Sequence, residues 1–136
     1  MFKLHARFVI EEGFFNPATE VIEFEVANDQ GAFYRAIVAP GVLDPNRNGR
    51  RYKFKDKTAS LLGPDSPVDC IAKLSFILRD FEGVPHATFR IHAYGNFSAA
   101  TKVTMTSQIS VGTTAASLTA DWTPKRKKWK LILTDF

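Results

Sequence analysis

Alternation of apolar and polar residues is the feature that most constrains the fold of this chain of 136 residues. In residues 2–10 the apolar side chains fall at every second position, and the same period recurs in residues 20–27, 87–94 and 101–111. A period of two places alternate side chains on opposite faces of a β-strand, so that one face packs on a core and the other meets water. The pattern predicts an all-β protein.

Turn residues divide this pattern into about eight or nine short strands. Gly, Asn and Pro recur between the alternating segments at short intervals, which is typical of antiparallel β-sandwiches and barrels. A chain of this length usually forms one domain. We therefore expect a single antiparallel β-sandwich over residues 1–136, with a β-barrel as the alternative.

One segment, residues 69–81, fits both a strand and a helix. Ile71 and Leu74 recur at helical spacing, whereas Leu74 and Phe76 alternate as they do in a strand. Because the neighbouring segments alternate with a period of two, we expect a strand here, and a helix over residues 69–81 is the alternative. Residues 60–69 contain glycine and proline and are predicted to form a loop.

Signals of compartment are few. Cys70 is the single cysteine, so the chain forms no intramolecular disulfide. Lys3, His5 and Arg7 interrupt the apolar residues near the start of the sequence, and this pattern differs from that of a secretory signal. Because no apolar run approaches the roughly 20 residues that span a bilayer, we expect no membrane span.

Side chains that commonly carry catalysis are sparse. The three histidines, His5, His86 and His92, lie among strand and turn residues, and no Gly-x-Ser-x-Gly motif occurs. A hydrolytic triad needs a nucleophile, a base and an orienting acid in contact. We therefore expect a non-enzymatic protein without a cofactor. Zinc is not expected either, because Cys and His do not cluster.

Asp44, Asn46 and Asn48 precede Gly49 with the spacing of the first half of an EF-hand calcium loop. The twelfth position of that loop supplies a bidentate Glu, but here it is Lys55, and neighbouring arginines repel a cation. Asn and Gly are also common turn residues. We expect a turn without a metal, and calcium binding by Asp44, Asn46 and Asn48 is the alternative.

Positive charge is concentrated in a predicted hairpin at residues 122–130. The chain carries a net charge of +4, and Trp122 and Trp129 flank a group of cations that consists of Lys125, Arg126, Lys127, Lys128 and Lys130. In one interpretation the tryptophans pack in the core and the lysines protect a sheet edge. In the other, the hairpin contacts an anionic glycan, another polyanion or an acidic subunit. Nucleic acid is not expected, because neither an OB-fold pattern nor an RNA-recognition motif occurs.

Negative charge is concentrated in the first 30 residues, at Glu11, Glu12, Glu20, Glu23 and Glu25. A domain with an acidic part and a basic part suits head-to-tail association, which builds rings or filaments. These glutamates are therefore the predicted partner surface for the basic hairpin of another subunit.

Three pairs of segments occur in series: residues 15–20 (FNPATE) before 21–26, residues 39–41 (APG) before 51–56 (RYKFKD), and residues 73–74 (KL) before 88–95 (TFRIHAYG). This series resembles an uncharacterised β-module that is often repeated in exported bacterial proteins. In that family a turn similar to Pro-Ala-Gly precedes a strand of the form Tyr-Lys-Tyr-Lys-Asp. The resemblance implies an extracellular setting and a non-enzymatic role, and it brings no catalytic residue or cofactor.

Together these features favour a non-enzymatic structural or interaction module. We expect a self-assembling subunit or a repeat unit of an extracellular bacterial protein, with other protein subunits as partners. The alternative is a carbohydrate- or polyanion-binding β-sandwich that uses the basic hairpin between Trp122 and Trp129.

Overall fold

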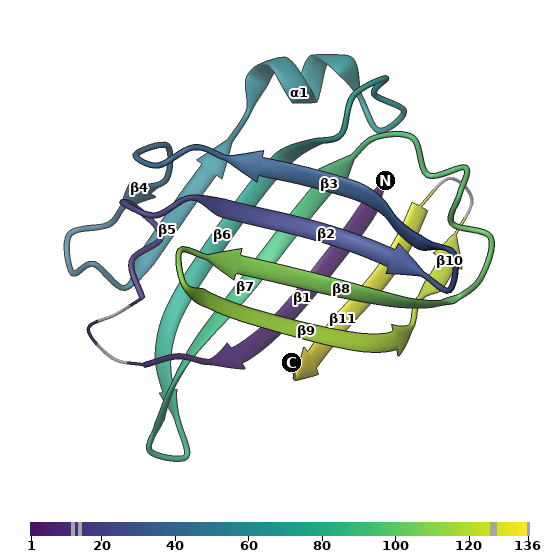
Figure 1. The fold of residues 1–136 in the computed structure, drawn as a ribbon. Helices are drawn as coiled ribbons and strands as arrows, with labels where there is room; N and C mark the ends of the chain where they lie inside the picture. The colour runs from purple at the N-terminus through teal and green to yellow at the C-terminus, as the bar shows by residue number, and fades with distance from the viewer. Residues whose placement is uncertain (12, 14, 126–127, 136) are drawn as a thin grey trace.

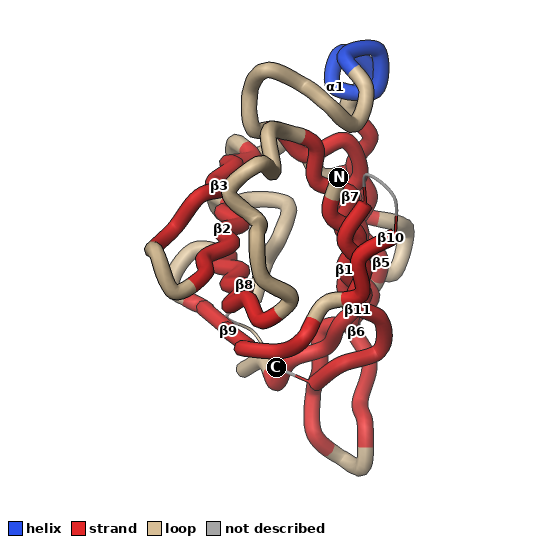
Figure 2. The backbone as a smooth tube through the Cα atoms, turned by 90° about the vertical axis from the view of Figure 1, so that its right-hand side faces the viewer, coloured by secondary structure: helices blue, strands red, loops and turns tan. Residues whose placement is uncertain are grey.

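Two β-sheets pack face to face in the computed structural model, which describes residues 1–11, 13, 15–125 and 128–135 (Figures 1 and 2). The described elements are β1 (Phe2–Val9), β2 (Ile22–Asn28), β3 (Gly31–Val38), β4 (Asp44–Pro45), β5 (Arg51–Lys55), α1 (Lys57–Leu62), β6 (Cys70–Phe81), β7 (Val84–Tyr94), β8 (Thr104–Val111), β9 (Thr114–Asp121), β10 (Thr123–Lys125) and β11 (Lys128–Asp135). The all-β prediction is confirmed. The barrel alternative is wrong, because the described strands form two separate sheets.

The large sheet has the strand order β10-β11-β1-β7-β6-β5-β4, and the small sheet has the order β3-β2-β8-β9. The small sheet's strands run across those of the large sheet (Figure 1). Two short strands, β4 and β10, lie at the edges of the large sheet and account for the excess over the expected strand number.

One strand pair departs from the expected antiparallel arrangement. Strand β11 runs parallel to β1, with Phe2 opposite Trp129 and Lys3 opposite Lys130. The other described pairs are antiparallel. The chain leaves the small sheet after β9, and the β10–β11 hairpin then returns it along the free edge of β1. A long crossover of this kind permits parallel pairing, whereas a tight hairpin does not.

The core lies between the sheets and contains the side chains that the alternation predicts to face inward. Phe2 is fully buried and its ring packs edge-on against Phe97 and Trp122, with centroids 4.4 and 5.0 Å away. From the small sheet, Phe24 is also fully buried and contacts Tyr34. Such aromatic pairs add about 0.5–1.5 kcal/mol each beyond the area that they bury.

Residues 69–81 contain strand β6, so the helix alternative for this segment is wrong. Leu74 and Phe76 point inward and are buried, and they lie opposite Ile91 and Phe89 of β7. The two strands form the longest hairpin of the large sheet and project beyond its end (Figure 1). Tertiary pairing therefore decides between two periods that fit the sequence about equally well.

A short helix overlaps the beginning of the segment predicted to be a loop. Helix α1 begins after Asp56, whose Oδ1 accepts hydrogen bonds from the backbone N–H groups of Thr58 and Ala59 (2.9 and 3.1 Å). It ends at Gly63, whose φ of 80° favours glycine. Figures 1 and 2 place α1 at one end of the sandwich. Within the described residues, no helix has the length and apolar character required to cross a membrane.

Candidate functional site

Cross-strand pairing brings basic side chains from five adjacent strands into one line on the outward face of the large sheet. Lys55 of β5 lies opposite Lys73 of β6, which lies opposite His92 of β7. His92 in turn lies opposite Lys3 of β1, whose partner on β11 is Lys130. We call these five residues the lysine row. Lys3, Lys73 and His92 alternate with buried neighbours along their strands, and Lys55 and Lys130 alternate with half-buried ones. Their side chains therefore all leave the same face of the sheet.

A second line of polar residues lies two positions further along the same strands. Lys53 of β5 lies opposite Ser75, and Ser75 lies opposite Arg90. Arg90 lies opposite His5 of β1. At the sheet edge, Asp44 of β4 lies opposite Lys53 and contributes a carboxylate. The lysine row together with Lys53, Arg90 and His5 is called the basic face below.

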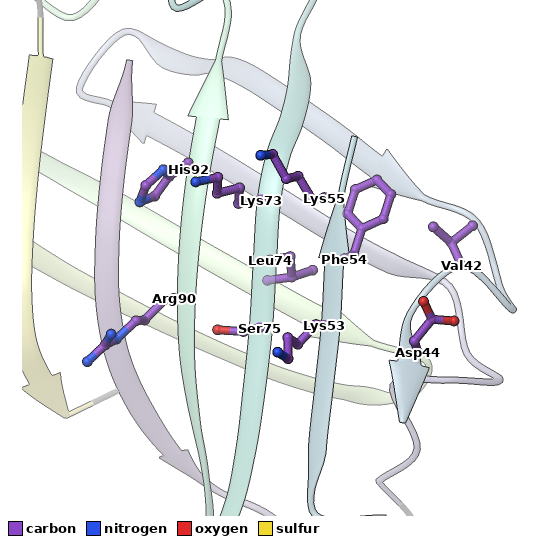
Figure 3. A pocket seen from close by; sticks show the side chains of 10 residues that line it. All are labelled: Val42, Asp44, Lys53, Phe54, Lys55, Lys73, Leu74, Ser75, Arg90 and His92. Carbon is purple, nitrogen blue, oxygen red and sulfur yellow. The ribbon is translucent and has the colours of Figure 1, made fainter. Parts of the chain in front are cut away.

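Two depressions lie along the basic face. The larger has a volume of about 710 Å³ and is lined by Val42, Asp44, Lys53, Phe54, Lys55, Lys73, Leu74, Ser75, Arg90 and His92. In Figure 3, His92, Lys73 and Lys55 follow one another above the line formed by Arg90, Ser75 and Lys53. The smaller depression, of about 340 Å³, shares Arg90 and His92 with the larger one and extends to Lys3 and Lys130. The two depressions therefore adjoin at Arg90 and His92, and together they are called the groove below.

The crowding of positive charge changes the acidity of the groups in and beside the lysine row. Burial, followed by the charges of Lys3, Lys73 and Lys128, lowers the pKa of His92 below its usual value. The charge of Lys3 is the main cause of a lowered pKa at Lys128, with smaller effects of burial, Lys125 and Lys130. Like charges at this spacing disfavour one another's protonated forms. An anion bound to the basic face relieves this repulsion.

His5 has a related environment on the second line. Burial, and then the charge of Arg90, lowers the pKa of His5. The third histidine, His86, lies opposite Val9 of β1, on the outward side of the same sheet. Its Nδ1 lies 2.8 Å from the carbonyl oxygen of Val84, and its ring packs edge-on against Phe81.

The predicted basic hairpin forms one edge of this same sheet. Lys125 of β10 lies opposite Lys128 of β11, and Lys130 belongs to the lysine row. Arg126 and Lys127 lie outside the described residues. The described part of the hairpin therefore extends the positive charge of β1, β6 and β7 to the sheet edge.

Neither tryptophan of the hairpin faces outward with the lysines. Trp122 is 2% exposed and packs in the core, and its Nε1 has no hydrogen-bond partner among the described residues. Trp129 is half-buried and lies opposite Phe2, on the inward face of the large sheet. The structure therefore places the two tryptophans as the core-packing interpretation of the sequence expects.

The acidic residues lie on other parts of the molecule. Glu23 and Glu25 of β2 are on the outward face of the small sheet, where Glu23 Oε1 accepts a hydrogen bond from Arg35 Nε at 2.6 Å. Arg35 is the main cause of a lowered pKa at Glu23. Exposed Glu11 and Glu20 lie in the connection between β1 and β2, and Glu12 lies outside the described residues. Acidic and basic charge thus separate largely between the two outward faces of the sandwich.

The loop that resembles half an EF-hand uses its amide oxygens internally. Asn46 Oδ1 accepts hydrogen bonds from the backbone N–H groups of Arg50 and Arg51, both at 3.1 Å. Asn48 Oδ1 accepts one from Arg50 at 3.0 Å, whereas Asp44 lies in β4 beside the larger depression. The described residues contain no group of three or more His, Cys, Asp or Glu side chains that is arranged as a metal site.

Comparisons with known protein families, curated proteins and solved structures gave no match. The resemblance to the repeated β-module therefore stays an interpretation of the sequence. Since a fold by itself does not imply a function, function has to be argued from the basic face and its chemistry.

Proposed function

We propose that this protein is a non-enzymatic binding module that attaches to an anionic polymer through the basic face of the large sheet. The observation that carries the proposal is the strand register, which aligns Lys55, Lys73, His92, Lys3 and Lys130 in one row. A cluster of like charges destabilises the free protein slightly. A bound anion neutralises these cations and removes the repulsion between them. This behaviour is expected of a binding surface rather than of a structural one.

The electrostatics of such a surface favour polymers over small anions. Each lysine that neutralises an anionic group of a polymer releases a condensed counterion, so the affinity accumulates along the row and falls steeply with salt. Positive potential over a broad face also accelerates the encounter with an anionic partner. The expected ligand is therefore held by several moderate contacts across the face.

Chromatography on heparin, a sulfated glycan that serves here as a general polyanion, tests this proposal. The variant Lys3→Thr/Lys73→Thr removes two cations of the lysine row and keeps residues that favour strands. We expect it to elute at lower salt than the wild type, and the slope of log affinity against log salt to fall by about 1 to 2. Wild-type protein that passes through the column near physiological salt contradicts the proposal.

A charge-matched control separates the basic face from net charge. Arg35→Thr/Lys102→Thr removes two cations from the part of the molecule around the small sheet, where Arg35 pairs with Glu23 and Lys102 pairs with Asp29. We expect its elution to remain close to that of the wild type. Equal losses in both double variants contradict a role for the basic face in particular.

Self-association is a second candidate, and the outward-facing glutamates of the small sheet favour it. Glu25 lies on the outward face of the small sheet, where it can oppose the basic face of another copy in a head-to-tail contact. Because Glu23 already pairs with Arg35, this acidic surface attracts cations less than a foreign polyanion does. Sedimentation velocity at low and moderate salt tests the candidate, which predicts assembly at low salt, whereas a monomer at both salts excludes it.

A further inference from the structure

We infer that the ligand of the basic face is a linear acidic polysaccharide that lies across the strands, along the lysine row. This inference rests on the proposed function and narrows its ligand class. Three observations carry it: the direction of the row, the side chains that line the groove, and the carboxylate at its end.

The row sets the direction of the bound chain. Neighbouring strands lie about 4.8 Å apart, so five adjacent strands place the outer members of the row roughly 19 Å apart. Four of the five members are lysines. The second line replaces two of these cations with Ser75 and His5. Attraction is therefore greatest for a chain that crosses the strands with anionic groups at regular intervals.

The lining of the groove distinguishes a glycan from single-stranded nucleic acid. Proteins that bind single strands without sequence preference stack bases on aromatic side chains. Among the described residues that line the two depressions, Phe54 is the single Phe, Tyr or Trp. Phe54 lies between the outward-facing Lys53 and Lys55 on β5 and packs against the core. The groove thus offers cations and few stacking surfaces.

Asp44 is the strongest indication of a sugar. Its carboxylate lies at the edge of the larger depression, on the strand next to Lys53 (Figure 3). A carboxylate accepts hydrogen bonds from hydroxyl groups, which a sugar supplies in number, but it repels a phosphate or sulfate. Val42 adds an apolar wall for the C–H face of a sugar ring. This end of the groove therefore suits a sugar that carries both hydroxyls and an acidic group.

The variant Asp44→Ala tests the inference because the two ligand classes predict opposite signs. Affinities are measured by titration calorimetry for a uronic-acid hexasaccharide without sulfate groups and for a dT oligonucleotide with the same number of anionic groups. We expect Asp44→Ala to weaken the hexasaccharide about tenfold through the lost hydrogen bonds. For the oligonucleotide we expect binding about two- to threefold tighter, because a negative charge has been removed.

The outcomes separate the inference from the proposed function. If the wild type binds both probes equally and Asp44→Ala tightens both, the basic face is a general polyanion site and the glycan inference is wrong. If neither probe binds, the proposed function itself fails. Glu25→Ala removes an acid from the small sheet and serves as the matched control, for which neither affinity changes.

Oligosaccharides of increasing length test the direction in which the bound polysaccharide crosses the strands. Lys55→Thr/Lys73→Thr changes the end of the row beside Asp44 and weakens short and long oligosaccharides alike. Lys3→Thr/Lys130→Thr changes the far end and weakens only those long enough to reach β11. Equal effects of both variants on a disaccharide contradict a chain that crosses the strands. Thermal unfolding checks that each variant is folded.

Discussion

The outward face of the small sheet and that of the large sheet alternate with the same period, yet they differ in charge. On β2, Glu23 and Glu25 face solvent, and Arg35 of β3 balances Glu23. On the large sheet, the equivalent positions carry the lysine row, and the pKa of His92 is lowered by burial and by the lysines around it. The small sheet therefore balances part of its charge locally, as expected of a scaffold, whereas no lysine of the lysine row forms an ion pair among the described residues.

Alternation determines which side chains are buried but leaves the residues of the outward face free to vary. Inward residues of both sheets meet in one core, so each sheet depends on the other for stability. Outward residues have no such partner across the sandwich. Charge can therefore accumulate on one face at little cost to the fold.

The largest expected effect concerns the core that the two sheets share. Phe89 of β7 is fully buried and contacts Phe8 and Phe76. Phe89→Ala should lower the free energy of unfolding by about 3–5 kcal/mol, whereas Arg90→Thr, its exposed neighbour, should change it by about 0.5 kcal/mol or less. Urea denaturation followed by circular dichroism checks both. Similar losses of unfolding free energy in the two variants would contradict the assignment of Phe89 to the inward face and Arg90 to the outward face.

The next effect is the pH dependence of binding. Burial and neighbouring charges lower the pKa values of His92 and His5 in the free protein, so the neutral form of each predominates at pH 7. A bound anion favours the protonated forms and raises these pKa values. Affinity for a heparin-derived hexasaccharide should therefore rise about three- to tenfold as the pH falls from 7.5 to 5.5.

His92→Gln/His5→Gln is the control for this pH dependence. It should bind as the wild type does near pH 7.5 and gain little on acidification. In the absence of ligand, the free energy of unfolding of the wild type should fall on acidification, whereas its affinity for the hexasaccharide rises. A histidine whose folded pKa is below its unfolded value loses stabilisation as the pH falls through that unfolded value, near 6.5. If the affinity of the wild type does not depend on pH, His92 and His5 do not contact the bound anion.

A smaller effect separates the hairpin from the centre of the face. Lys125 is exposed on the edge strand β10, outside the lysine row. Lys125→Thr should weaken heparin binding about two- to threefold, less than Lys73→Thr, which removes a cation near the middle of the groove. Salt-gradient elution of the two single variants ranks them. The reverse order assigns the contact to the hairpin, as the sequence-based interpretation does.

The smallest effect concerns the ion pair of the small sheet. Glu23→Gln breaks an exposed pair with Arg35 and should cost about 0–1 kcal/mol of stability. Heparin elution should not change, because the pair lies on the opposite sheet. If this variant binds heparin more tightly, Arg35 contacts heparin once it is released from Glu23. That result would contradict an anion site confined to the large sheet.

Local sequence patterns were sufficient to predict most of the strands and many of the buried residues. The alternation identifies Phe2, Leu4, Phe24, Phe89 and Ile91 as inward residues, and all five are buried. Helix α1 escaped prediction because six residues are too few to show a helical period. Asp56 before it and Gly63 after it were the available signals. Parallel pairing of β11 with β1 also escaped, since no local feature specifies the partner of a final strand.

The basic face escaped prediction for a different reason. Lys3, Lys73 and Lys130 were each recognisable as polar-face or hairpin residues, but they lie far apart in the sequence. They come into one row because β6 pairs with β7, β7 with β1, and β1 with β11. A run such as residues 125–130 is conspicuous in a sequence, whereas a row across strands becomes visible once the register is known.

Mapping of a bound polyanion by amide chemical shifts tests the central claim most directly. The labelled wild-type chain is titrated with the heparin hexasaccharide, and shifts of backbone amides are compared between the two sheets. We predict changes concentrated at Lys3, Lys55, Lys73 and His92 and at their neighbours on β1, β5, β6 and β7, with β2, β3, β8 and β9 unchanged. Changes confined to the small sheet, or no changes at all, contradict the assignment of function to the basic face.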